Sequence, residues 1–171
     1  MSSTFQLLFG DLLAISLMQI KNFPLSLYAL NHPSGQIGKR ISLLVSDLML
    51  TGDKIPLCKA SDSLQEILVE LSNKRCGCIL IVDEDSHLRG IFTDGDLRRS
   101  LQKYSDKALH QPMEELMSPN CRHIHPYLLA WDAMKLMEED YRRRITVLPV
   151  VDEELKVVGL IHLHDIIQSG L

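Results

Sequence analysis

The sequence has no surplus of positive charge, since 18 lysine and arginine residues stand against 22 aspartate and glutamate residues and the net charge is −4. Proteins that bind nucleic acids or anionic membrane surfaces gather lysine and arginine into basic patches. The acidic balance therefore predicts that the protein binds neither a nucleic acid nor a membrane.

Cysteine is also scarce, and Cys58, Cys76, Cys78 and Cys121 form no C-x-x-C pair. No basic segment of the kind that begins a secretory signal precedes the apolar N-terminal stretch. We therefore expect reduced thiols in a cytoplasmic protein. A metal site at Cys76 and Cys78 would need two more ligands, which only distant histidines could supply, so we predict no metal site.

A hydrophobic run that would comfortably cross a bilayer is missing as well. Residues 5–20 are apolar, but a span needs about 20 such residues, and Asp11 lies in the middle of the run. A helix that is apolar on every side is normally buried. We predict a helix here that packs against a partner other than the rest of the chain. Its apolar side chains are Phe5, Leu7, Leu8, Phe9, Leu12, Leu13, Ile15, Leu17, Met18 and Ile20.

What the sequence does contain is an internal repeat. Two short segments ending in methionine, residues 45–49 and 113–117, each precede a stretch with apolar residues at helical spacing. Each helix is followed by an apolar strand that ends in Val-Asp, a polar turn, and a glycine-led strand that runs into a second helix. The predicted order in each repeat is strand, helix, strand, hairpin, strand, helix.

One repeat of about 60 residues is marginal for a core of its own, so we expect the two to pack into a single α/β domain. The predicted boundaries are 1–40 for the N-terminal segment, 41–105 for the first repeat and 106–171 for the second. Residues 79–83 match residues 147–152, the apolar strands that end in Val-Asp. Residues 90–97 match residues 159–166, which contain the glycine-led strand and the start of the second helix.

This arrangement resembles a pair of cystathionine β-synthase (CBS) domains, also called a Bateman module, over residues 44–171. The N-terminal residues make the resemblance more specific. The whole chain is similar to the C-terminal half of the arabinose 5-phosphate isomerases of the KpsF/GutQ family, in which a sugar isomerase (SIS) domain precedes the CBS pair. The segments that carry this likeness are residues 9–11, 31–40, 47–53, 90–99 and 162–165.

The resemblance implies a function in two parts. The isomerase family interconverts ribulose 5-phosphate and arabinose 5-phosphate for the synthesis of Kdo, a sugar of lipopolysaccharide. Residues 1–40 would be the last helix and exit loop of its SIS domain, and His32 would be an acid/base residue of that domain when intact. The chain alone, without the rest of that domain, is expected to be inactive.

Thr93 and Asp96 allow two interpretations. T-x-x-D at the start of a helix is a capping box, in which both side chains satisfy backbone groups. The same place can also bind a ligand, because a helix N-terminus attracts phosphate and a carboxylate accepts hydrogen bonds from vicinal ribose hydroxyls. The resemblance assigns Thr93 and Asp96 these ligand-binding roles, and His162 and Asp165 are the candidates at the matching place in the second repeat.

The function that we predict is regulatory binding of a nucleotide or a sugar nucleotide, with no required cofactor. Two alternatives stay open: a purely structural module that holds an oligomer together, and a free-standing adenylate sensor. The SIS-like segment argues against the second alternative. The expected partners are the SIS domain and further copies of the chain, in a dimer or a tetramer.

The apolar N-terminal helix leads to a prediction about self-association. Burying one large apolar side chain is worth about 1.5–3 kcal/mol, so a helix with several of them exposed favours association. Light scattering should give at least a dimer for the whole chain, with Leu8, Leu12 and Ile15 in the contact. Deleting residues 1–40 should reduce the association. A monomeric whole chain with a well-ordered N-terminus would contradict this account.

Overall fold

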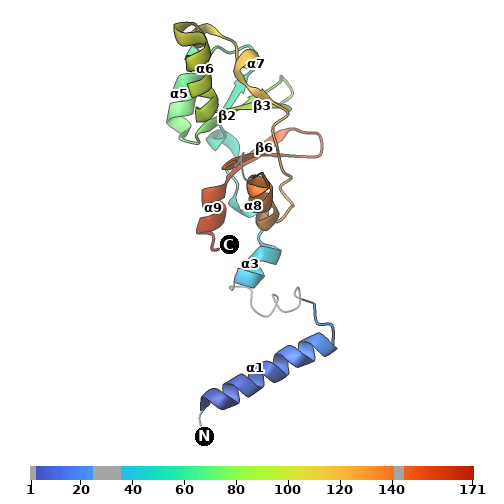
Figure 1. Ribbon diagram of the computed structural model, residues 1–171. Helices are drawn as coiled ribbons and strands as arrows, with labels where there is room; N and C mark the ends of the chain where they lie inside the picture. The colour runs from blue at the N-terminus through green and yellow to red at the C-terminus, as the bar shows by residue number, and fades with distance from the viewer. Residues whose placement is uncertain (1–2, 25–35, 141–144) are drawn as a thin grey trace. The chain divides into compact units, whose positions relative to one another are not determined.

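The computed structural model describes residues 3–24, 36–140 and 145–171. The chain divides into two compact units, residues 1–42 and residues 43–171. The second unit contains both repeats (Figure 1).

The first unit contains helix α1 (Ser3–Ile20) and helix α3 (Gln36–Ser42). The predicted apolar helix is confirmed as α1, none of whose side chains is buried; Phe5 is 68% exposed and Ile20 is 76% exposed. By length and composition α1 qualifies as a candidate membrane span, a test that signal sequences and core helices of soluble proteins also pass. The prediction that the protein binds no membrane therefore stays a prediction.

Helix α3 corrects one expectation, because residues 36–40 were predicted to belong to a loop. Lys39 and Arg40 lie in its last turn, where cations interact favourably with the negative end of the helix dipole. His32 lies outside the described residues.

The first repeat follows the predicted order. The short helix α4 (Val45–Leu48) and the 3₁₀ turn η1 (Gly52–Lys54) lead into strand β1, and the 3₁₀ turn η2 (Ser105–His110) ends the repeat. The intervening elements are β1 (Leu57–Lys59), α5 (Leu64–Lys74), β2 (Cys78–Val82), β3 (Leu88–Thr93) and α6 (Asp94–Tyr104). Strand β1 is parallel to β2, and β2 is antiparallel to β3.

The second repeat repeats this order with one difference. Its predicted first strand is reduced to a single bridge, in which Ile124 pairs in parallel with Val150. Its elements are α7 (Met113–Leu116), β4 (Ser118–Pro119), α8 (Ala130–Glu138), β5 (Val147–Val151), β6 (Val157–His162) and α9 (Leu163–Gln168). Both β-hairpins carry an irregularity at the matching place, Ile81/Val82 in one and Val150/Val151 in the other.

The two repeats exchange their first segments. Strand β4, which opens the second repeat, pairs with β3 of the first repeat. Leu50, which follows α4 in the first repeat, pairs with Leu160 on β6 of the second repeat. The hairpin turns also cross, because Leu88 N donates to Leu155 O and Val157 N donates to Ser86 O. Each sheet is therefore completed by the other repeat.

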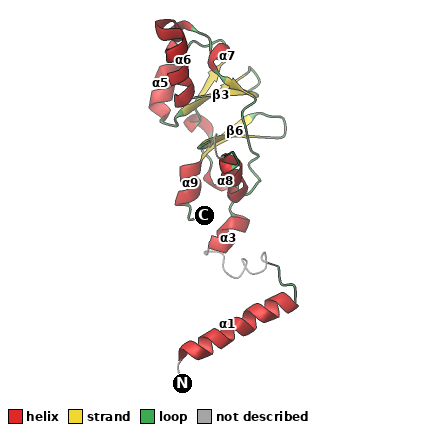
Figure 2. Cartoon of the chain, viewed as in Figure 1, coloured by secondary structure: helices red, strands yellow, loops and turns green. Residues whose placement is uncertain are grey.

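Among the residues that the structure describes, three apolar clusters hold the second unit together. Helix α5 and η2 cover the outer face of the first sheet through a cluster that includes Leu64, Ile79 and Phe92. Helices α8 and α9 cover the outer face of the second sheet. The two sheets lie one above the other in Figures 1 and 2, and their inner faces meet in a third cluster. Its buried members are Ile55, Cys76, Cys78, Leu80, Ile91, Val147 and Leu160.

A glycine is the third residue of both β3 and β6, where the exchanged segments run close to the backbone. A Cβ on Gly90 would lie 2.8 Å from Met117 Sδ and 2.9 Å from the carbonyl oxygen of Ser118. A Cβ on Gly159 would lie 2.5 Å from Met49 Sδ and 3.1 Å from the carbonyl oxygen of Leu50. The glycine of each repeat thus makes room for the segment that comes from the other.

Gly90→Ala should lower the unfolding free energy by about 1–3 kcal/mol, because the new methyl group meets a backbone oxygen that cannot move freely. Gly95→Ala is the matched control, since its methyl group would meet nothing closer than Arg99 Nη1 at 3.4 Å. Urea denaturation of both variants measures the difference. Equal stabilities for Gly90→Ala and the wild type would contradict the exchanged packing.

Candidate functional site: a polar cavity between the repeats

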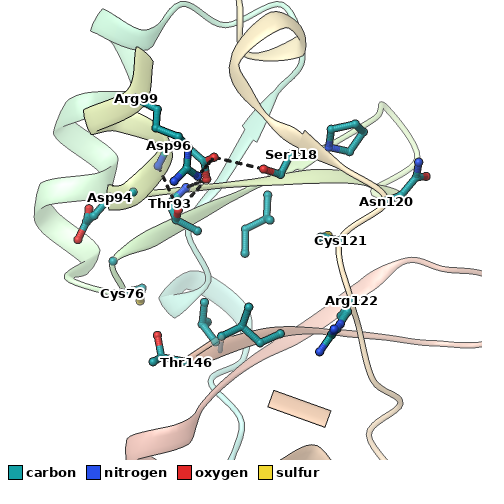
Figure 3. Close-up of a pocket in the computed structure, with 16 residues that line it drawn as sticks. Cys76, Thr93, Asp94, Asp96, Arg99, Ser118, Asn120, Cys121, Arg122 and Thr146 are labelled. Carbon is teal, nitrogen blue, oxygen red and sulfur yellow. Dashed lines mark hydrogen bonds and ion pairs between the residues drawn. The ribbon is translucent and has the colours of Figure 1, made fainter. Parts of the chain in front are cut away.

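A cavity of about 930 Å³ lies where the two repeats meet. Its size falls in the range of small-molecule sites, about 300–1,000 Å³. Residues of α6, of the segment 118–122 and of β5 line it (Figure 3). Its polar lining side chains are Thr93, Asp94, Asp96, Arg99, Ser118, Asn120, Arg122 and Thr146.

The first wall of the cavity is the start of α6, which Thr93 and Asp96 shape as a capping box. Thr93 Oγ1 accepts from the backbone N–H of Asp96 at 3.3 Å, and Asp96 Oδ2 accepts from the backbone N–H of Thr93 at 2.9 Å. The Thr93 hydroxyl also donates to Asp96 Oδ2 at 2.6 Å. The capping box inferred from the sequence is confirmed.

The other oxygen of Asp96 is engaged as well. Asp96 Oδ1 accepts from Arg99 Nη2 at 2.7 Å and from the Ser118 hydroxyl at 3.2 Å. Its side chain is 9% exposed, whereas that of Arg99 is 70% exposed. Asp96 is therefore a buried carboxylate with four hydrogen bonds, one of which comes from a segment 22 residues further along the chain.

These contacts decide the ionisation of Asp96. Burial alone raises the pKa of the carboxyl, but the hydrogen bonds from the Thr93 hydroxyl, Arg99 and the Thr93 backbone outweigh it, and the pKa lies below its ordinary value. The group is consequently an anion at neutral pH and stabilises the fold in that form.

The opposite end of the cavity carries a second cation, Arg122. Its Nη1 donates to the carbonyl oxygen of Leu136 at 2.9 Å and lies 3.6 Å from Glu139 Oε2. Its side chain is 35% exposed. These contacts fix the guanidinium group from one side, and Figure 3 shows Arg122 next to Cys121, away from Asp96.

The matching residues of the second repeat do not line this cavity. His162 Nε2 lies 3.1 Å from the carbonyl oxygen of Cys76, so this histidine joins the repeats through the backbone. Asp165 Oδ2 lies 3.5 Å from His162 Nδ1. Helix α9 has no side-chain cap at His162, in contrast to Thr93 at α6.

Cys76 and Cys121 also face the cavity. Burial raises the pKa of Cys121 to about 11 and that of Cys78 to about 12, and burial also raises the pKa of Cys76. These groups are therefore thiols at neutral pH, not nucleophilic thiolates. Over residues 3–24, 36–140 and 145–171, no three His, Cys, Asp or Glu side chains are grouped in a way that could hold a metal ion.

Arg99, Ser118 and Arg122 line the cavity but were not among the site residues predicted from the sequence. Arg99 carried a signal, because it lies one helical turn after Asp96, at a spacing where opposite charges pair. Ser118 and Arg122 lie in an irregular segment, and only the exchanged pairing of β4 brings them to the cavity.

Comparison with protein families settles the relationship. The CBS domain matches residues 45–103 and residues 113–170. The chain belongs to the CBS-domain family. The two duplicated strand–helix units are thus a pair of CBS domains.

Curated relatives match almost the whole chain, including the N-terminal segment that precedes the CBS pair. Arabinose 5-phosphate isomerase KdsD of Salmonella typhi is 38% identical over 99% of this chain and 50% of its own length. An uncharacterized protein of Chlamydia pneumoniae is 41% identical over 99% of this chain and 52% of its own length. The chain therefore spans about half the length of the curated relatives that it matches.

Solved structures confirm the fold. The CBS pair of protein MJ0100, crystallised with 5′-methylthioadenosine and S-adenosyl-L-methionine, is 27% identical to this chain and has a TM-score of 0.62. The match covers 73% of this chain and 93% of that one. The predicted α/β tandem CBS fold is thereby confirmed.

The lowered pKa of Asp96 predicts how acid affects stability. A carboxylate whose pKa is lower in the folded chain than in the unfolded chain contributes stability above the unfolded value, and the contribution disappears as the pH falls below it. Asp96→Asn should cost about 1–2 kcal/mol at pH 7. The difference from the wild type should shrink between about pH 5 and pH 3.

Urea denaturation at several pH values measures this difference. Asp165→Asn is the matched control in the second repeat and should cost less at pH 7, because its contact with His162 is 3.5 Å long. A constant difference between the wild type and Asp96→Asn across this range would contradict the ionised, hydrogen-bonded Asp96.

Proposed function

We propose that the cavity binds a nucleotide or a nucleotide-activated sugar, and that this binding regulates an arabinose 5-phosphate isomerase to which the chain belongs. The observation that carries the proposal is the cavity itself, with a buried carboxylate at one end and an arginine at the other. A nucleotide offers hydroxyl donors and an anionic phosphate, which suit these two ends.

The charges favour one orientation of the ligand. A helix N-terminus carries an effective charge of about +0.5, but Asp94 and Asp96 both lie in the first turn of α6. Arg99 offsets the charge of Asp96, but the carboxylate of Asp94 still outweighs half a positive charge, so the helix start is a poor place for phosphate. The sugar hydroxyls then lie towards Asp96, and the phosphate lies towards Arg122, with Arg99 as a second cation at the rim.

Two similarities support the proposal. The CBS pair of MJ0100 was crystallised with adenosine derivatives, which are nucleoside ligands of the proposed class. The likeness to KdsD extends through residues 1–42, ahead of the CBS pair. Within the proposal, α1 and α3 belong to the end of an SIS domain, His32 serves its active site, and the product feeds the synthesis of Kdo in the cytoplasm.

A thermal-shift screen with AMP, ATP, CMP and a cytidine-activated sugar tests the binding. A ligand at 100 times its Kd stabilises the folded chain by about 2.7 kcal/mol, which raises Tm by about 5–10 °C for a chain of this length. Arg122→Met should abolish the shift by removing the phosphate contact. Arg98→Met removes the same charge from an exposed position outside the cavity and should leave the shift unchanged.

The outcome separates this function from its main rival. If none of these compounds raises Tm, the CBS pair is a structural module and the proposal is wrong. If Arg98→Met and Arg122→Met lose the shift equally, the cavity is not the binding site.

A further inference from the structure

Asp96 has no lone pair left for a ligand in this structure. An ionised carboxylate offers about four acceptor positions, and Asp96 uses four: two for Thr93, one for Arg99 and one for Ser118. The Thr93 hydroxyl has no proton left for a ligand, because it donates to Asp96 Oδ2, and it also accepts from the Asp96 backbone N–H. A ligand hydroxyl can therefore bind Asp96 only by taking the place of an existing donor.

We infer that this donor is Ser118, whose hydroxyl acts as a built-in competitor for the ligand. The inference rests on the proposed function and adds to it how the site is regulated. Ser118 Oγ occupies the position on Asp96 Oδ1 that a ligand hydroxyl takes, and binding exchanges one hydroxyl for another. Figure 3 shows Ser118 and Asp96 joined in this way at the upper end of the cavity.

Geometry identifies Ser118 as the donor that yields. Its 3.2 Å contact with Asp96 is longer than the 2.5–3.0 Å usual for an O–H donor. Arg99 Nη2 lies at 2.7 Å and carries a charge, which makes its hydrogen bond roughly twice as strong. The two bonds from Thr93 belong to the capping box, so their loss would also uncap α6.

The exchange breaks the hydrogen bond that connects β4 to the start of α6. Ser118 lies in β4, which leads directly into Asn120 and Arg122 on the opposite wall of the cavity. The hydroxyl of Ser118 thus connects the start of α6 to the segment that carries the proposed phosphate contact. A ligand that reaches both Asp96 and Arg122 replaces this internal connection with its own.

In the described part of the second repeat, no hydroxyl occupies the equivalent position. Ser118 pairs with Ile91 on β3, and the residue that pairs at the same register with Leu160 on β6 is Leu50. Asp165 accordingly has His162 beside it instead of a serine from the exchanged segment. The competing hydroxyl is therefore a feature of the first-repeat site within the described residues.

Isothermal titration calorimetry on the full chain tests the inference. The probes are AMP and CMP, each compared with its 2′,3′-dideoxy analogue, and the proteins are the wild type, Ser118→Ala, Ser118→Thr and Arg99→Ala. Ser118→Ala should bind the ribonucleotide about 2–10-fold more tightly, the equivalent of one net hydrogen bond. The gain should vanish with the dideoxy analogue, which has no hydroxyl to place on Asp96.

The control proteins distinguish the possible outcomes. Ser118→Thr keeps the hydroxyl and should bind as the wild type does, and urea denaturation confirms that each variant is folded. Unchanged or weaker ribonucleotide binding by folded Ser118→Ala overturns the inference but leaves the proposed function standing. Tighter binding by Arg99→Ala in place of Ser118→Ala also overturns it. No binding of either ribonucleotide by any of the proteins rejects the proposed function and, with it, the inference.

Discussion

The packing of the two sheets against each other is the interaction on which the rest of the structure depends. The inner faces of β2, β3, β5 and β6 share one apolar cluster, and the first segment of each repeat crosses to complete the other sheet. Neither sheet has a complete inner surface without its partner. The cavity lies at this junction, so its two ends come from different repeats and their separation is set by the shared core.

The fold followed from the sequence to a large extent because its signals are local and duplicated. The Thr93–Asp96 capping box, the two hairpins and the apolar faces of α5 and α8 were all visible in residue spacing. The exchange of segments was not visible, because Ser118 and Leu50 find their partners through tertiary packing. The same limit explains α3, where a predicted loop forms a short helix.

Only one side of the site, the start of α6, could be predicted from the sequence. Thr93 and Asp96 were found because a capping box and a ligand-binding helix start share one spacing. Arg122 and Ser118 come from an irregular segment with no periodicity, and the cavity exists only when the repeats are packed. Thr93 lines the cavity, but its counterpart His162 does not, because the ring of His162 contacts the backbone of Cys76. Sequence duplication therefore does not imply two equal sites.

The central claim is that a nucleotide lies between Asp96 and Arg122, and a crystal structure of the chain with a bound ribonucleotide tests it most directly. The account predicts that the ribose hydroxyls contact Asp96 Oδ1, that the Ser118 hydroxyl has turned away, and that the phosphate contacts Arg122. A ligand bound beside His162 and Asp165, with the four hydrogen bonds of Asp96 intact, would contradict it.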